Sequence, residues 1–211
     1  MVKLTKILLC SGVFSVGLLA TANAALETRL GGLAVYDTDL NITWLADANY
    51  AKTSGYDADG LMNWHDANTW AASLSIEGVT GWRLPAVDTT CTGFNCSNSE
   101  MGHLFYNELG GKAKSPISLS SDPDLALFTH VQYGYWSGTG FASDPHLAWL
   151  FLFDYYERSG EQSVDFRSYV SYAWAVHDGD VGAGLVPEPE TYAMMSIGLL
   201  MLFGFRRLKQ C

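Results

Sequence analysis

Between the two ends of the chain, apolar residues recur at helical spacing in two places. In the first, successive apolar positions are three or four residues apart; they are Trp64, Ala67, Ala71 and Leu74. Such positions form one face of an α-helix, and Asn63 directly before them is a residue type that caps helix N-termini. A second helix is expected over residues 100–109, where Ser97 and Glu100 have the spacing of a capping box. Gly110 follows this segment and predicts its end.

The other patterned segments are short and rich in β-branched and aromatic residues, which predicts strands. Two lie near the start of the domain, at 33–37 and 41–45, and a third, residues 82–85, ends at a proline. The second half of the chain carries four more, at 133–137, 147–153, 163–166 and 171–176. Two early helices followed by a strand-rich half predict an α+β fold, with the helices packed on an antiparallel sheet.

Residues 1–24 have the three parts of a secretory signal. Lys3 and Lys6 precede the apolar run 7–20, and small residues alternate at the cleavage point that ends with Ala24. A membrane span needs about 20 apolar residues, more than this run offers. Signal peptidase is therefore expected to remove residues 1–24.

The other end of the chain, residues 186–211, combines a proline motif, an uncharged apolar run and a basic cluster. The motif is Pro187, Glu188 and Pro189, and the cluster that follows the run contains Arg206, Arg207 and Lys209. As a helix at ~1.5 Å per residue, the run 191–205 covers roughly 22 Å, less than a hydrocarbon core of ~30 Å. This favours a transient inner-membrane anchor. Basic residues stay in the cytoplasm, so the preceding domain should face outward.

This C-terminal order resembles the PEP-CTERM sorting signal. The resemblance implies that an exosortase, a membrane protease or transpeptidase of Gram-negative bacteria that produce exopolysaccharide, processes the chain. It implies an inner-membrane intermediate that faces the periplasm, and then a place on the cell surface or in the extracellular matrix. The resemblance concerns sorting and assigns no activity to the domain.

The exported part of the chain is strongly acidic. Five of the 12 Lys and Arg residues lie in the terminal segments, which leaves seven against all 22 Asp and Glu and a net charge of −15. This charge should repel nucleic acid and other polyanions at long range, so no nucleic-acid partner is expected. Cations or neutral glycans are more suitable ligands for a domain of this charge. The charge can also serve solubility alone. Hydrophobic residues, 48% of the chain, are enough for residues 25–185 to fold as one domain.

Two of the four cysteines, Cys91 and Cys96, lie in that domain. Cys10 falls in the signal, and Cys211 lies beyond the apolar C-terminal run. In an oxidising periplasm, two cysteines this close with a glycine between them favour a local disulfide. A redox or metal-binding pair is the alternative, but the spacing is not Cys-x-x-Cys.

Several motifs occur in an order that resembles the Lcl C-terminal domain family. The most specific are Trp-Arg-Leu-Pro at 82–85 and Tyr-Trp-Ser at 135–137; Thr-Trp-Leu at 43–45 and Ala-Trp-Ala-Val at 173–176 flank them. The resemblance covers most of residues 33–181. It implies a bacterial extracellular domain with the element order of C-type-lectin-like and formylglycine-generating-enzyme-like folds. Some members are implicated in binding glycosaminoglycans, which a charge of −15 does not favour in this chain.

Two acidic loops have spacings that calcium ligands use. The first contains Asp37, Asp39 and Asn41, and the second contains Asp57 and Asp59. Calcium binds carboxylate and amide oxygens, but neither loop completes the EF-hand pattern, because its glycine is missing from the first and comes too early in the second. Turn formation explains the same residue types. The expectation is that the protein has no cofactor, with calcium at these loops as the alternative.

The second predicted helix also carries Glu100, His103 and Glu108. Glu100 and His103 share a face, as metal ligands do in some helical proteins. No second pair of this kind occurs, and the predicted capping box already uses Glu100, so a metal site is not expected here. Motifs of serine hydrolases, zinc proteases and phosphate-binding loops are absent. The chain is therefore expected to be non-enzymatic; a sugar- or protein-modifying enzyme is the alternative.

Aromatic residues crowd the strand-rich half. Trp82, Trp136 and Trp174 are expected in the core. Three others flank turns and charged residues and are expected at the surface as ligand contacts: Tyr155, Tyr156 and Tyr169. Exposed tyrosines combine an apolar ring with a polar hydroxyl, which suits contact with sugars. The sequence thus predicts a lectin-like surface or matrix protein that contacts exopolysaccharide. A purely structural envelope or biofilm component is the alternative.

Overall fold

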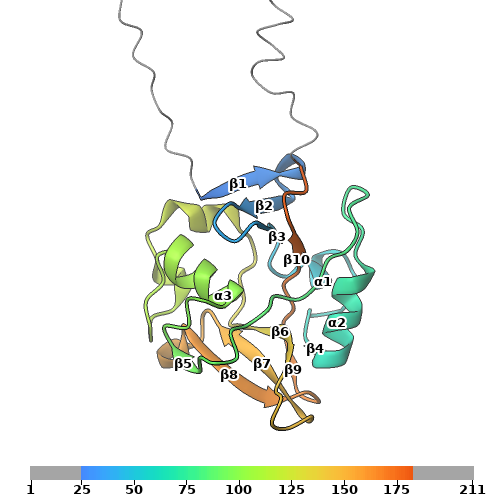
Figure 1. Ribbon diagram of the computed structural model, residues 1–211. Helices are drawn as coiled ribbons and strands as arrows, with labels where there is room; N and C mark the ends of the chain where they lie inside the picture. The colour runs from blue at the N-terminus through green and yellow to red at the C-terminus, as the bar shows by residue number, and fades with distance from the viewer. Residues whose placement is uncertain (1–24, 183–211) are drawn as a thin grey trace, which may run out of the picture.

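The computed structural model describes residues 25–182. The predicted signal at 1–24 and the predicted sorting segment at 186–211 lie outside these residues and stay predictions. Within 25–182 the chain forms one mixed α/β domain with antiparallel sheets and few helices (Figure 1). No helix in this part of the chain has both the length and the apolar character needed to cross a membrane.

The first sheet joins the two ends of the domain. It has the strand order β1-β2-β3-β10, with all neighbours antiparallel; the strands are β1 (Leu26–Arg29), β2 (Ala34–Asp37), β3 (Ile42–Leu45) and β10 (Val176–Asp178). β2 and β3 are the two strands predicted at 33–37 and 41–45; they pair as a hairpin whose register places Asp37 opposite Ile42. An ion pair of 2.7 Å between Arg29 Nε and Asp180 Oδ1 further ties the two ends of the domain together.

The second sheet contains most of the aromatic strands and lies at the opposite end of the domain (Figure 1). Its order is β5-β8-β7-β6, and all neighbours are antiparallel; the strands are β5 (Gly93–Phe94), β8 (Glu161–Phe166), β7 (Leu147–Leu152) and β6 (Gly134–Gly140). A small two-stranded sheet accompanies it, in which β4 (Met62–Asn63) pairs with β9 (Val170–Ser171). The strands predicted in the second half are confirmed, except that 171–176 is split between β9 and β10.

Two helical segments lie on opposite sides of the domain, between the sheets (Figure 1). α2 (Trp64–Ser73) begins as predicted, because the Asn63 side chain accepts hydrogen bonds from the backbone N–H groups of His65 and Asp66, both at 3.1 Å. α3 (Glu100–His103) continues as a π-helix (Leu104–Glu108). The shorter helices are α1 (Tyr50–Thr53) and four 3₁₀ turns at Leu30–Gly32, Ile117–Leu119, Pro123–Leu127 and Tyr156–Arg158.

Two local predictions are wrong. Ser97 and Glu100 form no capping box: the helix begins after Ser99, whose hydroxyl donates to the Gln162 side chain instead of capping the helix. The Glu100 carboxylate is held by Arg83 and by the backbone N–H of Ala86. Residues 82–85 form no strand, and Arg83 makes a single isolated β-bridge to Val176. In both places long-range partners determine the conformation, and the local pattern did not contain them.

The core connects the two four-stranded sheets through Trp174. Its ring contacts Trp44 of the first sheet at 5.3 Å and Tyr135 of the second at 5.2 Å between ring centroids. The indole N–H donates to the Leu45 carbonyl at 2.7 Å, which satisfies the polar atom of a fully buried ring. Burial of Trp82, Trp136 and Trp174 is confirmed.

Candidate functional site

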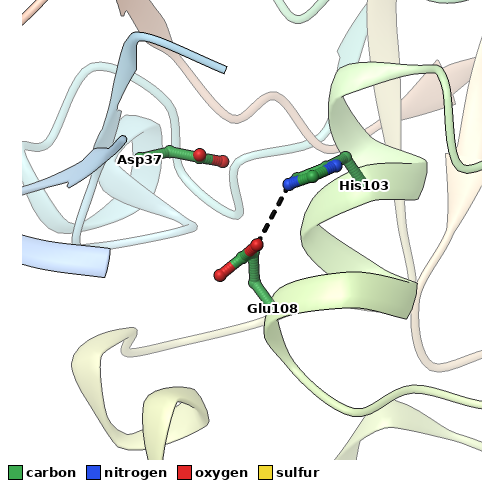
Figure 2. A group of neighbouring side chains, drawn as sticks. All are labelled: Asp37, His103 and Glu108. Atoms are coloured by element: carbon green, nitrogen blue, oxygen red, sulfur yellow. Dashed lines mark hydrogen bonds and ion pairs between the residues drawn. The ribbon is translucent and has the colours of Figure 1, made fainter. Parts of the chain in front are cut away.

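Two features of the domain combine polar chemistry with a defined geometry. The first is a cluster of three titratable side chains from segments far apart in sequence: Asp37 at the end of β2, His103 at the end of α3 and Glu108 at the end of the π-helix (Figure 2). One ligand-type atom from each lies within 4.8 Å of the others. His103 Nε2 and Glu108 Oε1 are 3.0 Å apart.

The π-helix explains why His103 and Glu108 meet. In an α-helix with 3.6 residues per turn, positions five apart point in clearly different directions. Over Leu104–Glu108 the chain is wound more widely, with i to i+5 hydrogen bonds, so the fifth residue returns to the face of the first. The Leu109 N–H donates to the Leu104 carbonyl at 2.9 Å in this pattern. Single π-turns inside helices are frequent at functional sites.

Asp37 uses its two oxygens differently. Oδ1 accepts hydrogen bonds from the backbone N–H groups of Asp39 and Leu40, each at 3.0 Å, and so holds the turn between β2 and β3. Oδ2 is buried and has no hydrogen-bond partner among the described residues. The whole residue is 0% exposed. Figure 2 shows its carboxyl group pointing toward His103 and Glu108.

Burial disfavours negative charge at both carboxyl groups of this cluster. Desolvation raises the pKa of Asp37 above its usual value, against the hydrogen bonds from Leu40 and Asp39. Desolvation also raises the pKa of Glu108, and the nearby charge of Asp37 raises it further, while His103 acts in the opposite direction. Two carboxyl groups and one imidazole in a buried space therefore form a site that favours a positively charged occupant.

The predicted calcium loop at Asp37, Asp39 and Asn41 is only partly brought together. Asp37 joins the cluster, and Asp39 Oδ2 lies 4.0 Å from His103 Nε2 with its side chain 59% exposed. Asn41 Oδ1 instead accepts a hydrogen bond from the Tyr36 hydroxyl at 2.9 Å. From the sequence, His103 and Glu108 were considered with Glu100 and set aside. Asp37, the partner that completes the cluster, comes from strand β2 of the first sheet, and no helix periodicity could have revealed it.

The second predicted calcium loop forms turns. Asp57 Oδ1 accepts from the backbone N–H groups of Asp59 and Gly60 at 3.0 and 2.7 Å, and Asp59 Oδ1 accepts from Leu61 at 2.9 Å. These bonds lower the pKa of Asp57, the largest effect being that of the Asp59 N–H. Asx turns of this kind use the residue types that a calcium loop also uses, so the spacing could not separate the two structures.

The predicted disulfide between Cys91 and Cys96 is confirmed, with Cα atoms 5.6 Å apart. Gln162 of β8 lies beneath this loop and is fully buried. Its side-chain amide donates to the carbonyls of Cys91 and Asp88 at 2.7 and 2.9 Å. The loop is thus held to the second sheet by a buried polar side chain as well as by its own covalent bond.

The second feature is a pocket of about 370 Å³ on one face of the second sheet. Partners across antiparallel strands share a face, and the row Trp136, Leu150 and Ser163 forms the floor of this pocket. Tyr133 and Tyr155 lie at its edge, with ring centroids 5.7 Å apart. The remaining lining combines polar and apolar side chains: Leu152, Arg158, Val164, Asp165, Val170 and Ser171.

The structure separates the three tyrosines that the sequence grouped. All are exposed, at 43% for Tyr155, 80% for Tyr156 and 57% for Tyr169. Only Tyr155 lines the pocket. Tyr156 contacts Tyr155 edge-on at 6.4 Å, and Tyr169 packs against Phe166 at 5.4 Å. The sequence missed Tyr133, which directly precedes β6 and lies beside Tyr155 because its carbonyl accepts hydrogen bonds from the Phe153 and Asp154 N–H groups, just after β7.

Comparison with protein families matches residues 33–177 to the Lcl C-terminal domain. The match covers more than half of the chain and includes β2, the helices α2 and α3, and the second sheet. A comparison with curated proteins found no match. The match agrees with the motifs at 82–85 and 135–137 that suggested the family. The chain belongs to the Lcl C-terminal domain family, a family of extracellular domains.

Proposed function

We propose that this domain is a non-catalytic carbohydrate-contacting module of an exported surface or matrix protein. The observation that carries the proposal is the pocket on the second sheet, whose lining includes Tyr133 and Tyr155 together with the polar side chains of Ser163 and Asp165. Aromatic rings that are partly exposed offer faces for the C–H side of a sugar ring. Hydroxyl and carboxylate groups nearby can bond sugar hydroxyls.

The tyrosines are held in place by their neighbours. Tyr133 contacts Tyr155 at 5.7 Å and Tyr172 at 5.2 Å between centroids, so the rings form a continuous row. The Tyr155 backbone N–H donates to the Ser159 hydroxyl at 2.8 Å, which fixes the chain where β7 ends. A row of fixed rings loses little conformational freedom on binding, which favours affinity for a flexible polysaccharide.

The charge of the pocket selects among saccharides. Arg158 is paired with Glu161 at 2.6 Å, and Asp165 adds a further negative charge. The domain is acidic as a whole, so sulfated or carboxylated polymers are repelled at long range. Neutral saccharides, or segments of them within a cell-surface polysaccharide, are the ligand class that fits.

Two other hollows offer a poorer combination of groups. One, of about 490 Å³, is mainly apolar and lies along residues such as Leu33, Leu45 and Leu127. Another, of about 420 Å³, is formed by the loop residues 110–123 and contains no aromatic side chain. The first contains a single aromatic side chain, Tyr50, and the second contains none, so neither offers the adjoining pair of rings found in the pocket on the second sheet.

The wider biology of the proposal rests on the ends of the chain and on the fold. The C-type-lectin-like arrangement that the family resemblance implies for this domain would fit a saccharide ligand. The PEP-CTERM-like segment, with Pro187-Glu188-Pro189 before an apolar run and Arg206-Arg207, fits sorting by an exosortase in a bacterium that produces exopolysaccharide. Signal peptidase, exosortase, the inner membrane and exopolysaccharide are thus the proposed partners.

The test is binding of the full chain, produced by export so that its disulfide forms, to exopolysaccharide from its host and to a panel of neutral glycans. Saturable binding that falls about tenfold or more in Tyr155→Ala and in Tyr133→Ala is expected. Tyr169→Ala is the matched control, because this exposed tyrosine lies outside the pocket lining. Absence of saturable binding to any glycan would contradict the proposal and favour a purely structural envelope or matrix component.

A further inference from the structure

The Asp37, His103 and Glu108 cluster has the ligand composition of a transition-metal site. It offers one imidazole nitrogen and two carboxylate groups, whose ligand-type atoms all lie within 4.8 Å of one another. Zinc binds such nitrogen and oxygen atoms at ~2.0–2.2 Å in a tetrahedron, so neighbouring ligands lie roughly 3.3 Å apart. The 3.0 Å between His103 Nε2 and Glu108 Oε1 is close to that separation.

The Asp37 carboxyl group supplies an independent observation. Its Oδ2 atom is buried, lacks a hydrogen-bond partner among the described residues, and points toward the other two side chains (Figure 2). A buried polar oxygen without a partner is costly, and native proteins pair nearly all such atoms. The free oxygen of a carboxylate whose other oxygen is already bonded is a ready metal ligand.

We propose that Asp37, His103 and Glu108 bind one divalent ion of the zinc class, with water in the remaining position. The imidazole selects against calcium, which takes six to eight oxygen ligands. Imidazole with carboxylates suits zinc and its first-row neighbours. The exposed Asp39 carboxylate, 4.0 Å from His103 Nε2, marks the side from which an ion would enter. This site is separate from the carbohydrate pocket and does not depend on it.

Neighbouring groups hold the ligands in position. The Asp37 carboxylate is oriented by the backbone N–H groups of Asp39 and Leu40, which occupy Oδ1 and leave Oδ2 for the ion. The Asn107 side-chain amide lies 3.1 Å from His103 Nδ1. With a metal on Nε2, Nδ1 carries the proton and donates a hydrogen bond to the Asn107 amide oxygen after a rotation of that amide. Such outer contacts set the tautomer and orientation of metal-bound histidines.

The ion would join two parts of the fold. Asp37 belongs to the turn after β2, and His103 and Glu108 belong to the helical segment packed beside it. The unusual π-helical winding, which places His103 and Glu108 on one face, then has a function as the means of presenting two ligands five positions apart. A metal bound only by the folded chain stabilises it.

The experiment uses the full chain with an affinity tag that contains no histidine, stripped with chelator and titrated with Zn²⁺ by calorimetry. One ion per chain is expected, together with a rise in melting temperature that chelator reverses. Asp37→Asn, His103→Gln and Glu108→Gln should each weaken binding by roughly 100-fold or more. Asp37→Asn retains Oδ1, which can still accept the two turn hydrogen bonds, so this variant tests the ligand with little change to the turn.

The matched control is His130→Gln. His130 also pairs with a carboxylate, at 3.0 Å from Asp47 Oδ1, but lies at an exposed site outside the cluster. If a ligand variant fails to fold, chemical modification of the histidines in the chain without substitutions tests the site. Zn²⁺ should protect His103 and leave His130 reactive. Lack of saturable Zn²⁺ binding, binding that survives in Asp37→Asn and Glu108→Gln, or equal loss in His130→Gln would each overturn the proposal.

Discussion

Arg83 and Glu100 form a two-point ion pair, with Nη1 to Oε2 at 2.8 Å and Nη2 to Oε1 at 2.7 Å. The pair joins the Trp-Arg-Leu-Pro segment to the first residue of α3. Arg83 also bonds Asp178 of β10, so one guanidinium links three segments. Both carboxylates raise the pKa of Arg83, Glu100 most.

Replacement of this arginine by lysine should destabilise the domain although the charge is kept. A lysine ammonium cannot make two parallel bonds to one carboxylate. Because the pair is partly exposed, Arg83→Lys is expected to lower the free energy of unfolding by about 1–2 kcal/mol in urea denaturation. Arg158 also bonds both oxygens of one carboxylate, that of Glu161, but this pair is more exposed, so Arg158→Lys should change the free energy of unfolding by less than about 0.5 kcal/mol. Equal effects in the two variants would show that the partial burial of the Arg83 pair and its third partner, Asp178, contribute nothing.

Loss of the disulfide should have a modest effect, because it closes a short loop. For the loop from Cys91 to Cys96, chain entropy gives about 2 kcal/mol of stabilisation. Reductant is therefore expected to shift the urea midpoint of the unmodified chain, and Cys91→Ser with Cys96→Ser should show the same shift. The double variant must be insensitive to reductant. A shift in that variant would mean that reductant acts elsewhere.

Gln162 is expected to matter more than its neutral side chain suggests. It accepts from Ser99 and donates to the carbonyls of Asp88 and Cys91 in a buried position. Gln162→Leu removes all three hydrogen bonds, so a loss of about 3 kcal/mol is predicted by urea denaturation. Gln132→Leu is the control, because its amide bonds one carbonyl at an exposed site. A loss below about 1 kcal/mol in Gln162→Leu would contradict the prediction.

Gly160 is required at the turn between β7 and β8 for two reasons. Its φ of +84° is strained for any residue with a Cβ, and an added Cβ would lie 2.4 Å from the Tyr106 hydroxyl. Gly160→Ala should therefore lower the melting temperature well beyond Gly55→Ala, whose φ of +78° is similar but whose surroundings are open. Similar shifts would show that Tyr106 moves aside without cost.

Features that depend on neighbouring residues could be predicted from the sequence. The helix at Trp64–Ser73 and its Asn63 cap follow from local spacing, and the disulfide follows from two cysteines in one loop. Burial of Trp174 follows from its size and apolar surroundings. These features require little knowledge of the rest of the chain.

Features that depend on distant partners could not be predicted in this way. Glu100 caps no helix, because Arg83 binds it more strongly than a local turn would. Asp37 meets His103 only because β2 lies beside α3, and Glu108 faces His103 only because the helix widens to a π-turn. Tyr133 joins Tyr155 through hydrogen bonds from the Phe153 and Asp154 N–H groups to the Tyr133 carbonyl. The candidate sites are made of such long-range contacts. The sequence shows which residue types are present, but it does not show which of them meet in the fold.

The carbohydrate pocket can be tested at single residues by tyrosine nitration with mass spectrometry, with and without the host polysaccharide. The account predicts that saccharide protects Tyr133 and Tyr155, which line the pocket. Tyr156 and Tyr169, more exposed but outside the lining, should stay reactive in the same sample. Nitration of Tyr155 at the same rate in both conditions, or protection that falls on Tyr169 instead, would contradict it.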